Sequence, residues 1–206
     1  MKLVPLTLLA AVALSPLAAH AARSLQAAPP RATQSSTAAA QPQRSEAPAP
    51  PAPRIGYRAE FLADLDEIQQ KYLDLAAAVP ADKYAWRPEP GVRSISEVYM
   101  HVAGSNYYLA TFVGAKPPAD IPKDFEKITD KTRVLAELQR SFDQLRMVAL
   151  TTPDADIDKT VMLFSNPASE RRVFTTILNH LHEHLGQSIA YARMNHVVPP
   201  WSRHEG

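Results

Sequence analysis

The sequence predicts an all-α domain, a four-helix bundle, on two observations. Between residues 55 and 206, apolar residues recur at helical spacing in four stretches of about 20 residues each. No stretch alternates with a period of two for long enough to build a sheet. Helices with one apolar face each bury those faces against one another, so a bundle is expected. Links of roughly 14 to 17 residues leave the order of connection around the bundle open.

The first two helices are defined by clear boundaries. The first is expected over about 57–79 and stops at Pro80, because proline cannot continue a helix. The second is expected over about 95–113, where Ser94 as N-cap and Glu97 three residues later form a capping box. The apolar face of the first helix consists of Phe61, Leu62, Leu65, Ile68, Tyr72, Leu75 and Val79.

The third and fourth helices follow over about 130–150 and 167–195. Pro167 suits the first turn of the fourth helix, where its missing N–H costs nothing. In the loop between them, the segment DKTVMLF is expected to form a short extended piece. The core-facing residues of the fourth helix are Phe174, Ile177, Leu181, Leu185 and Ser188.

The N-terminal part of the chain has the features of an export signal. Residues 1–21 combine Lys2, a long apolar stretch and small residues ending in Ala19-His20-Ala21, the order of a secretory signal peptide. Residues 22–54 are rich in proline and alanine and poor in core-forming side chains, so a disordered linker is expected there. The folded domain is then 55–206, periplasmic or secreted and free of the membrane after cleavage. The alternative is an uncleaved N-terminal anchor.

Charge and cysteine content exclude several classes of function. Five of the 22 basic and one of the 21 acidic residues precede residue 55, which leaves 17 and 20 and a domain charge near −3. A nucleic-acid partner is excluded, because it would require a basic face. The absence of cysteine excludes disulfides, thiolate metal ligands and a cysteine nucleophile.

The histidines are unevenly placed, with three of seven in the segment HLHEH. His180 and His184 lie one turn apart on one edge of the core stripe, within reach of a single ion. His101 lies at the margin of the corresponding stripe of the second helix. His182 and His196 are expected at the surface. Spacing alone is weakly specific, so half-buried structural histidines remain the alternative to a metal site.

Two stretches resemble proteins of the DinB-like family. WRPEPGVRSISEVYMHVAGSNYYL resembles the start of that family's second helix, and ILNHLHEHLGQSIAYARMNHVVPPWS resembles its last helix. The similarity covers about 57–203. It implies a four-helix bundle of the DinB-like type and a divalent metal held by His101, His180 and His184. Three neutral imidazoles suit zinc, with nickel or another first-row ion as alternatives, and leave a coordination position open.

Further expectations concern five other residues of the second and fourth predicted helices. Gly186 interrupts a helix, so close packing of another backbone is its expected purpose. Gln187 is expected to hydrogen-bond a metal ligand or a substrate, or else to lie in solvent. Glu97 is expected to cap its helix, with orientation of the histidine one turn later as the alternative. Tyr108 and Tyr191 either line a cavity or belong to the core.

The resemblance leaves two functions open. Characterised relatives include thiol S-transferases that use bacillithiol and a maleylpyruvate isomerase that uses mycothiol. Those thiols are cytoplasmic, whereas this chain is expected to be exported, which argues against thiol transfer. One hypothesis is a metal-dependent transferase or hydrolase acting on a small molecule, whose catalytic residues stay unassigned. The other is a non-catalytic metal-binding or stress-related envelope protein, and a homodimer stays open in both.

We predict that export removes residues 1–21 and leaves a chain that begins at Ala22, because a small-residue cleavage site precedes the polar linker. Mass spectrometry of the exported protein measures the new N-terminus. An intact N-terminus that sediments with membranes would contradict the prediction and indicate an uncleaved anchor.

Overall fold

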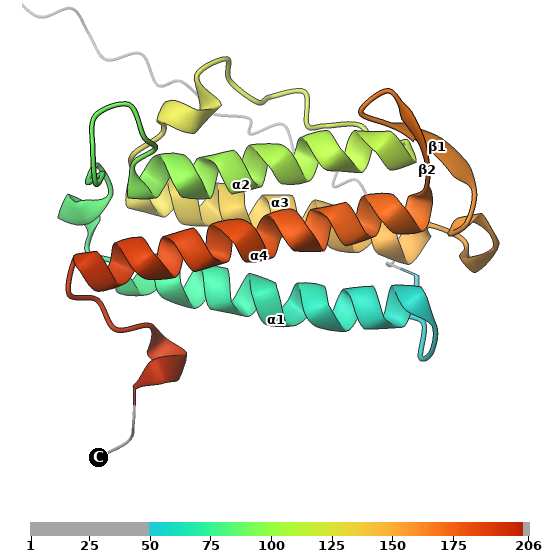
Figure 1. Cartoon of the computed structure of the whole chain (residues 1–206), viewed down its shortest axis with the longest axis horizontal. Helices are drawn as coiled ribbons and strands as arrows, with labels where there is room; N and C mark the ends of the chain where they lie inside the picture. Colours follow the sequence, from blue (N-terminus) through green and yellow to red (C-terminus); the bar gives the residue numbers. More distant parts are fainter. Residues whose placement is uncertain (1–49, 204–206) are drawn as a thin grey trace, which may run out of the picture. The chain divides into compact units, whose positions relative to one another are not determined.

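The computed structural model describes residues 50–203 and shows four long helices packed side by side (Figure 1). They are α1 (Tyr57–Ala78), α2 (Ile95–Ala110), α3 (Lys131–Thr151) and α4 (Glu170–Met194). Short 3-10 helices occur at η1 (Ala81–Lys83), η2 (Thr111–Val113), η3 (Phe125–Lys127), η4 (Asp154–Asp156) and η5 (Pro200–Ser202). The predicted signal peptide, 1–21, and the predicted linker up to residue 49 lie outside the described residues.

Helix packing determines which faces meet. α1 packs on α3 and α4, and α2 packs on the same two helices, so α2 and α4 are neighbours. Trp86, just before α2, packs edge-on against Tyr191 near the end of α4, with 5.5 Å between ring centroids. The start of α2 therefore lies beside the end of α4, and the two helices run antiparallel. This arrangement brings the predicted histidine-bearing helices together.

The link between α2 and α3 returns along α2 (Figure 1). Near its end, Glu126 accepts a hydrogen bond from the guanidinium of Arg93, which precedes α2, at 3.2 Å. The ring of Phe125 lies over Gly104 in the middle of α2. A segment that leaves α2 at its C-terminal end has thus come back to its N-terminal half. α3 then starts at the same end of the bundle as α2, a crossover connection that the sequence left open.

The core contains the residues that helical spacing predicted. All seven predicted apolar residues of the first helix are buried, as are the five predicted on the fourth. Tyr72 of α1 is fully buried and donates a hydrogen bond to the carbonyl oxygen of Leu181 in α4 at 2.7 Å. A buried hydrogen bond of this kind contributes about 1 kcal/mol net and fixes the two helices along their axes. It holds α4 at the turn between His180 and His184.

The predicted capping box is confirmed. The Ser94 hydroxyl accepts from the Glu97 backbone N–H at 3.3 Å, and the Glu97 carboxylate accepts from the Ser94 backbone N–H at 2.7 Å. The loop before it is anchored by Tyr84, which is buried and donates a hydrogen bond to the carbonyl oxygen of Ala76 at 2.8 Å.

The predicted start of the fourth helix is wrong. Pro167 lies in a two-stranded antiparallel hairpin, made of β1 (Thr160–Leu163) and β2 (Asn166–Ser169), and pairs with Met162. The extended piece expected in DKTVMLF is β1. α4 begins only after Ser169, whose hydroxyl accepts from the Arg172 backbone N–H at 3.2 Å.

The turn of this hairpin lacks the residues by which such turns are usually recognised in a sequence. Its two turn residues, Phe164 and Ser165, have φ of 48° and 68°. Turns with two positive φ angles normally carry asparagine, aspartate or glycine, and Phe164 and Ser165 are none of these.

Within residues 50–203, no helix is long and apolar enough to span a bilayer.

Candidate metal centre

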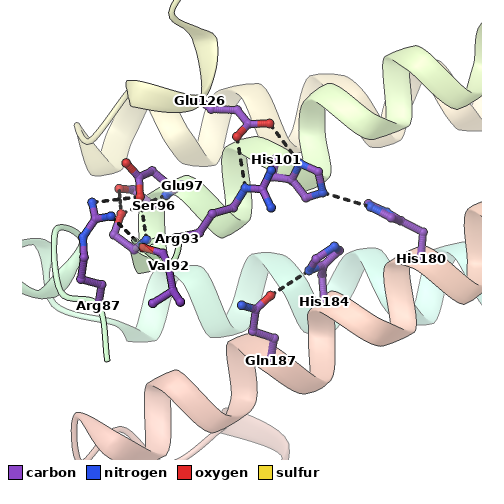
Figure 2. Close-up of polar contacts among 11 residues, drawn as sticks. Arg87, Val92, Arg93, Ser96, Glu97, His101, Glu126, His180, His184 and Gln187 are labelled. Atoms are coloured by element: carbon purple, nitrogen blue, oxygen red, sulfur yellow. Dashed lines mark hydrogen bonds and ion pairs between the residues drawn. The ribbon is translucent and has the colours of Figure 1, made fainter. Parts of the chain in front are cut away.

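The three predicted histidines come together between α2 and α4. The ring centroids of His101, His180 and His184 are 4.5 to 5.2 Å apart. One nitrogen from each ring lies within 4.8 Å of the other two. Figure 2 shows the ring of His101 directed from its own helix toward the two rings of α4. All three side chains are half-buried, whereas His182 and His196 are exposed and lie outside the cluster, as predicted.

Helical phase explains this placement. Leu181 and Leu185 of α4 are buried in the core. His180 and His184 each precede one of these leucines, so their rings lie at the edge of the buried stripe that faces α2. On α2, His101 lies between the buried Met100 and Val102 and occupies the matching edge.

His101 is oriented by a carboxylate. Its Nδ1 lies 3.0 Å from Oε1 of Glu126, whose other oxygen accepts from Arg93 (Figure 2). A carboxylate can only accept, so Nδ1 of the neutral ring carries the proton. Nε2 then holds a lone pair and is directed at His180. Such a carboxylate–histidine pair fixes the tautomer and the ring angle of a metal ligand.

His184 is oriented by an amide. Its Nδ1 lies 2.8 Å from Oε1 of Gln187, and Nε2 of Gln187 donates to the hydroxyl of Tyr191 at 3.1 Å. These two hydrogen bonds leave Nε2 of His184 as the unprotonated nitrogen of the neutral ring. Gln187 was expected to contact a metal ligand, a substrate or solvent, and the structure supports the first, a hydrogen bond with His184. Tyr191 belongs to the core, since only 9% of its surface is exposed.

His180 completes the cluster. Its Nε2 lies 3.3 Å from Nε2 of His101, and its Nδ1 is buried without a hydrogen-bond partner among residues 50–203. Two nitrogens bound to one tetrahedral zinc at about 2.0–2.1 Å are themselves about 3.3–3.4 Å apart. The spacing of these two rings therefore fits a shared first-row ion.

Burial favours the neutral rings of His101 and His180. Desolvation lowers the pKa of His180 to about 4, helped by the neighbouring His184, His101 and Arg93. Desolvation also lowers the pKa of His101, although the hydrogen bond to Glu126 acts in the opposite direction. Burial raises the pKa of Glu126, but the hydrogen bonds from His101 and Arg93 outweigh it and hold that pKa below its usual value. Unprotonated imidazole is the form that binds metal.

Two cavities adjoin the cluster. One of about 650 Å³ has His101 in its wall, and another of about 680 Å³ has His184 in its wall. Glu126 and Lys127 line both. The first cavity is lined mainly by apolar side chains and includes Tyr108, one of the two tyrosines considered from the sequence.

Two details of the site differ from expectation. The first is Glu126, the carboxylate that contacts His101, which no sequence pattern indicates; Glu97 caps α2 as expected and pairs with Arg87 at 2.9 Å. Glu126 lies 25 residues beyond His101, in a link without periodicity, so no spacing rule connects the two. The close packing expected at Gly186 is also wrong, because a Cβ there would meet nothing within 4 Å.

Comparison with known proteins identifies the fold. The family model for the DinB superfamily matches residues 64–188. A DinB-like protein from Bacillus cereus is similar with a TM-score of 0.60 and 16% identity, over 68% of this chain and 93% of that one. A second, from Bacillus subtilis, gives a TM-score of 0.54 and 14% identity, over 71% and 99%. Among curated proteins, no match to the chain is found.

We predict that the metal-free protein loses stability as the pH falls from 6.5 toward 4. In that window the unfolded chain protonates His180, with a pKa near 6.5, while the folded chain does not, so acid favours unfolding. After allowance for partial exposure to solvent, the free energy of unfolding should fall by about 1–2 kcal/mol between pH 7 and pH 5 from this ring. Urea titrations at both pH values measure it.

The matched variants are His180→Gln, which removes the buried titrating ring, and His182→Gln, which removes an exposed one. His180→Gln should lose less stability than the wild type on acidification, and His182→Gln should behave like the wild type. Identical losses in all three proteins would contradict the burial of a neutral His180.

Proposed function

Because the chain belongs to the DinB superfamily, we propose that it is an exported metalloprotein that holds one divalent ion through His101, His180 and His184. The observation that carries the proposal is the convergence of three imidazoles from two helices, two of them oriented through Nδ1 by Glu126 and Gln187. Export rests on the signal-peptide pattern of residues 1–21.

The donor set supports zinc as the first choice, with nickel or another first-row ion as the alternative. Imidazole nitrogens suit these metals, whereas calcium and magnesium prefer oxygen ligands. Zinc sites with three protein ligands keep a further position for water or substrate, which is the catalytic type of site. Two cavities adjoin the cluster, one at His101 and one at His184, so a small molecule has room beside the proposed ligands.

We propose a metal-dependent transferase or hydrolase that acts on a small molecule. When bound, the ion would polarise a substrate oxygen or lower the pKa of a coordinated water. The chain's own contribution is to orient the ligands, through Glu126 at His101 and Gln187 at His184. The acidic partner also offsets part of the positive charge that the site would carry.

Alanine at His101, His180 or His184 is expected to remove bound zinc at a protein concentration at which the wild type holds one ion per chain. Each substitution deletes one of three ligands. Glu126→Ala, which frees the ring of His101, should weaken binding by about tenfold. Elemental analysis and competition with a chromophoric chelator measure stoichiometry and affinity.

His182→Ala and His196→Ala are the matched controls, because both residues lie in exposed positions outside the cluster. They should bind zinc like the wild type. Full zinc content in the three ligand variants, or a loss in His182→Ala equal to that in His180→Ala, would contradict the proposed site. Turnover of ester, amide or electrophile substrates that disappears on chelation and returns with metal would establish the enzyme over a non-catalytic metal protein.

A further inference from the structure

We propose that the cavity beside His101 binds the aromatic part of the substrate, which would be a small aromatic molecule carrying one oxygen-bearing polar group. The inference rests on the proposed metal site and names the class of molecule that this site accepts. The polar group would lie at the histidine end of the cavity, and the ring would lie between α2 and the returning link.

The cavity has the size of a small-molecule site. Its volume of about 650 Å³ lies within the range of about 300–1,000 Å³ that is usual for such pockets. One wall is the face of α2 that carries His101, Gly104, Ser105, Tyr108 and Thr111. The other wall is the link that precedes α3. The single histidine in the lining is one of the three proposed ligands, so the cavity leads to the metal position.

The lining surface of the cavity is mostly apolar, although the charged residues Lys123, Asp124, Glu126 and Lys127 also line it. The link contributes Pro117, Ile121, Pro122 and Phe125, and α2 contributes the ring of Tyr108. Phe125 is 6% exposed, whereas 55% of Tyr108 is exposed, a large value for an aromatic residue of a helix. An aromatic guest gains from contact with aromatic walls beyond the area that it buries. The exposed Tyr108 would be covered by such a guest.

Gly104 leaves space at the centre of this wall. A Cβ there would lie 3.7 and 3.8 Å from two ring carbons of Phe125, so any longer side chain would project toward that ring. Tyr108 is held by the edge of Phe112, with 5.2 Å between centroids. The cavity is therefore bounded by the buried ring of Phe125 on one side and by the ring of Tyr108, which packs against Phe112, on the other. Because both rings are already held in place, less conformational entropy is lost when a ligand binds.

The second cavity is a poorer candidate for the substrate body. Four of its five charged residues are paired, Arg87 with Glu97 at 2.9 Å and Arg93 with Glu126 at 3.2 Å. An ionic ligand would have to break these pairs, one of which orients the carboxylate that contacts His101. The cavity beside His101 has a mostly apolar lining surface, and burial of that surface favours binding.

The experiment uses two hydroxamates that bind a metal through the same group. Isothermal titration of zinc-loaded protein compares acetohydroxamate with benzohydroxamate. We expect the benzohydroxamate to bind at least about tenfold more tightly, because its ring buries apolar area that a methyl group does not. Ser105→Phe, which fills the cavity, and Tyr108→Ala, which removes one wall, should each reduce that preference severalfold. Neither should change the affinity for acetohydroxamate.

Val92→Phe is the matched control, because Val92 lines the other cavity and is 39% exposed. It should leave the preference unchanged. Equal affinity of the two hydroxamates, or a preference that survives both Ser105→Phe and Tyr108→Ala, would overturn this inference while zinc binding stands. Failure of the wild type to bind zinc at all would overturn the proposed function, and this inference with it.

Discussion

The packing of α2 against α4 sets the separation of the three histidines, because one ring comes from α2 and two come from α4. Both helices place their histidines at the edge of a buried stripe, so the rings are withdrawn from water but are not enclosed by core residues. Tyr72 fixes α4 axially through the carbonyl oxygen of Leu181, next to His180. A slip of one helix along the other by a single residue, about 1.5 Å, would exceed the tolerance of about 0.5 Å that such a site allows.

Without an ion, the cluster is a site of unsatisfied polarity. Nδ1 of His180 is buried without a partner in the part of the chain that the structure describes, whereas its Nε2 can donate a hydrogen bond to the lone pair on Nε2 of His101. A buried polar atom without a partner costs about 1–3 kcal/mol. An ion shared by both Nε2 atoms would replace the hydrogen bond between them with two metal–nitrogen bonds. Metal binding would then also stabilise the fold.

The helices, and the positions of the histidines at the edges of their core stripes, were predictable from the sequence because both depend on a local periodicity of 3.6 residues. That the three histidines meet at one site was implied by the resemblance to the DinB-like family. The capping box at Ser94 was predictable because it is a short local motif. Glu126 was not, since a crossover link brings it to His101 and no local pattern reports that path. The start of α4 was misplaced because the hairpin turn at Phe164 and Ser165 lacks the usual turn residues. A glycine inside a helix does not by itself indicate close packing, because the space beside Gly186 is empty of other atoms.

The central claim is that one ion is held by three imidazoles from α2 and α4. X-ray absorption at the zinc edge of the metal-loaded protein tests it most directly, because the outer-shell pattern of imidazole counts the histidine ligands. The account predicts three imidazole nitrogens at about 2.0–2.1 Å and at least one further oxygen ligand. A shell of oxygen ligands with one imidazole or none would contradict it.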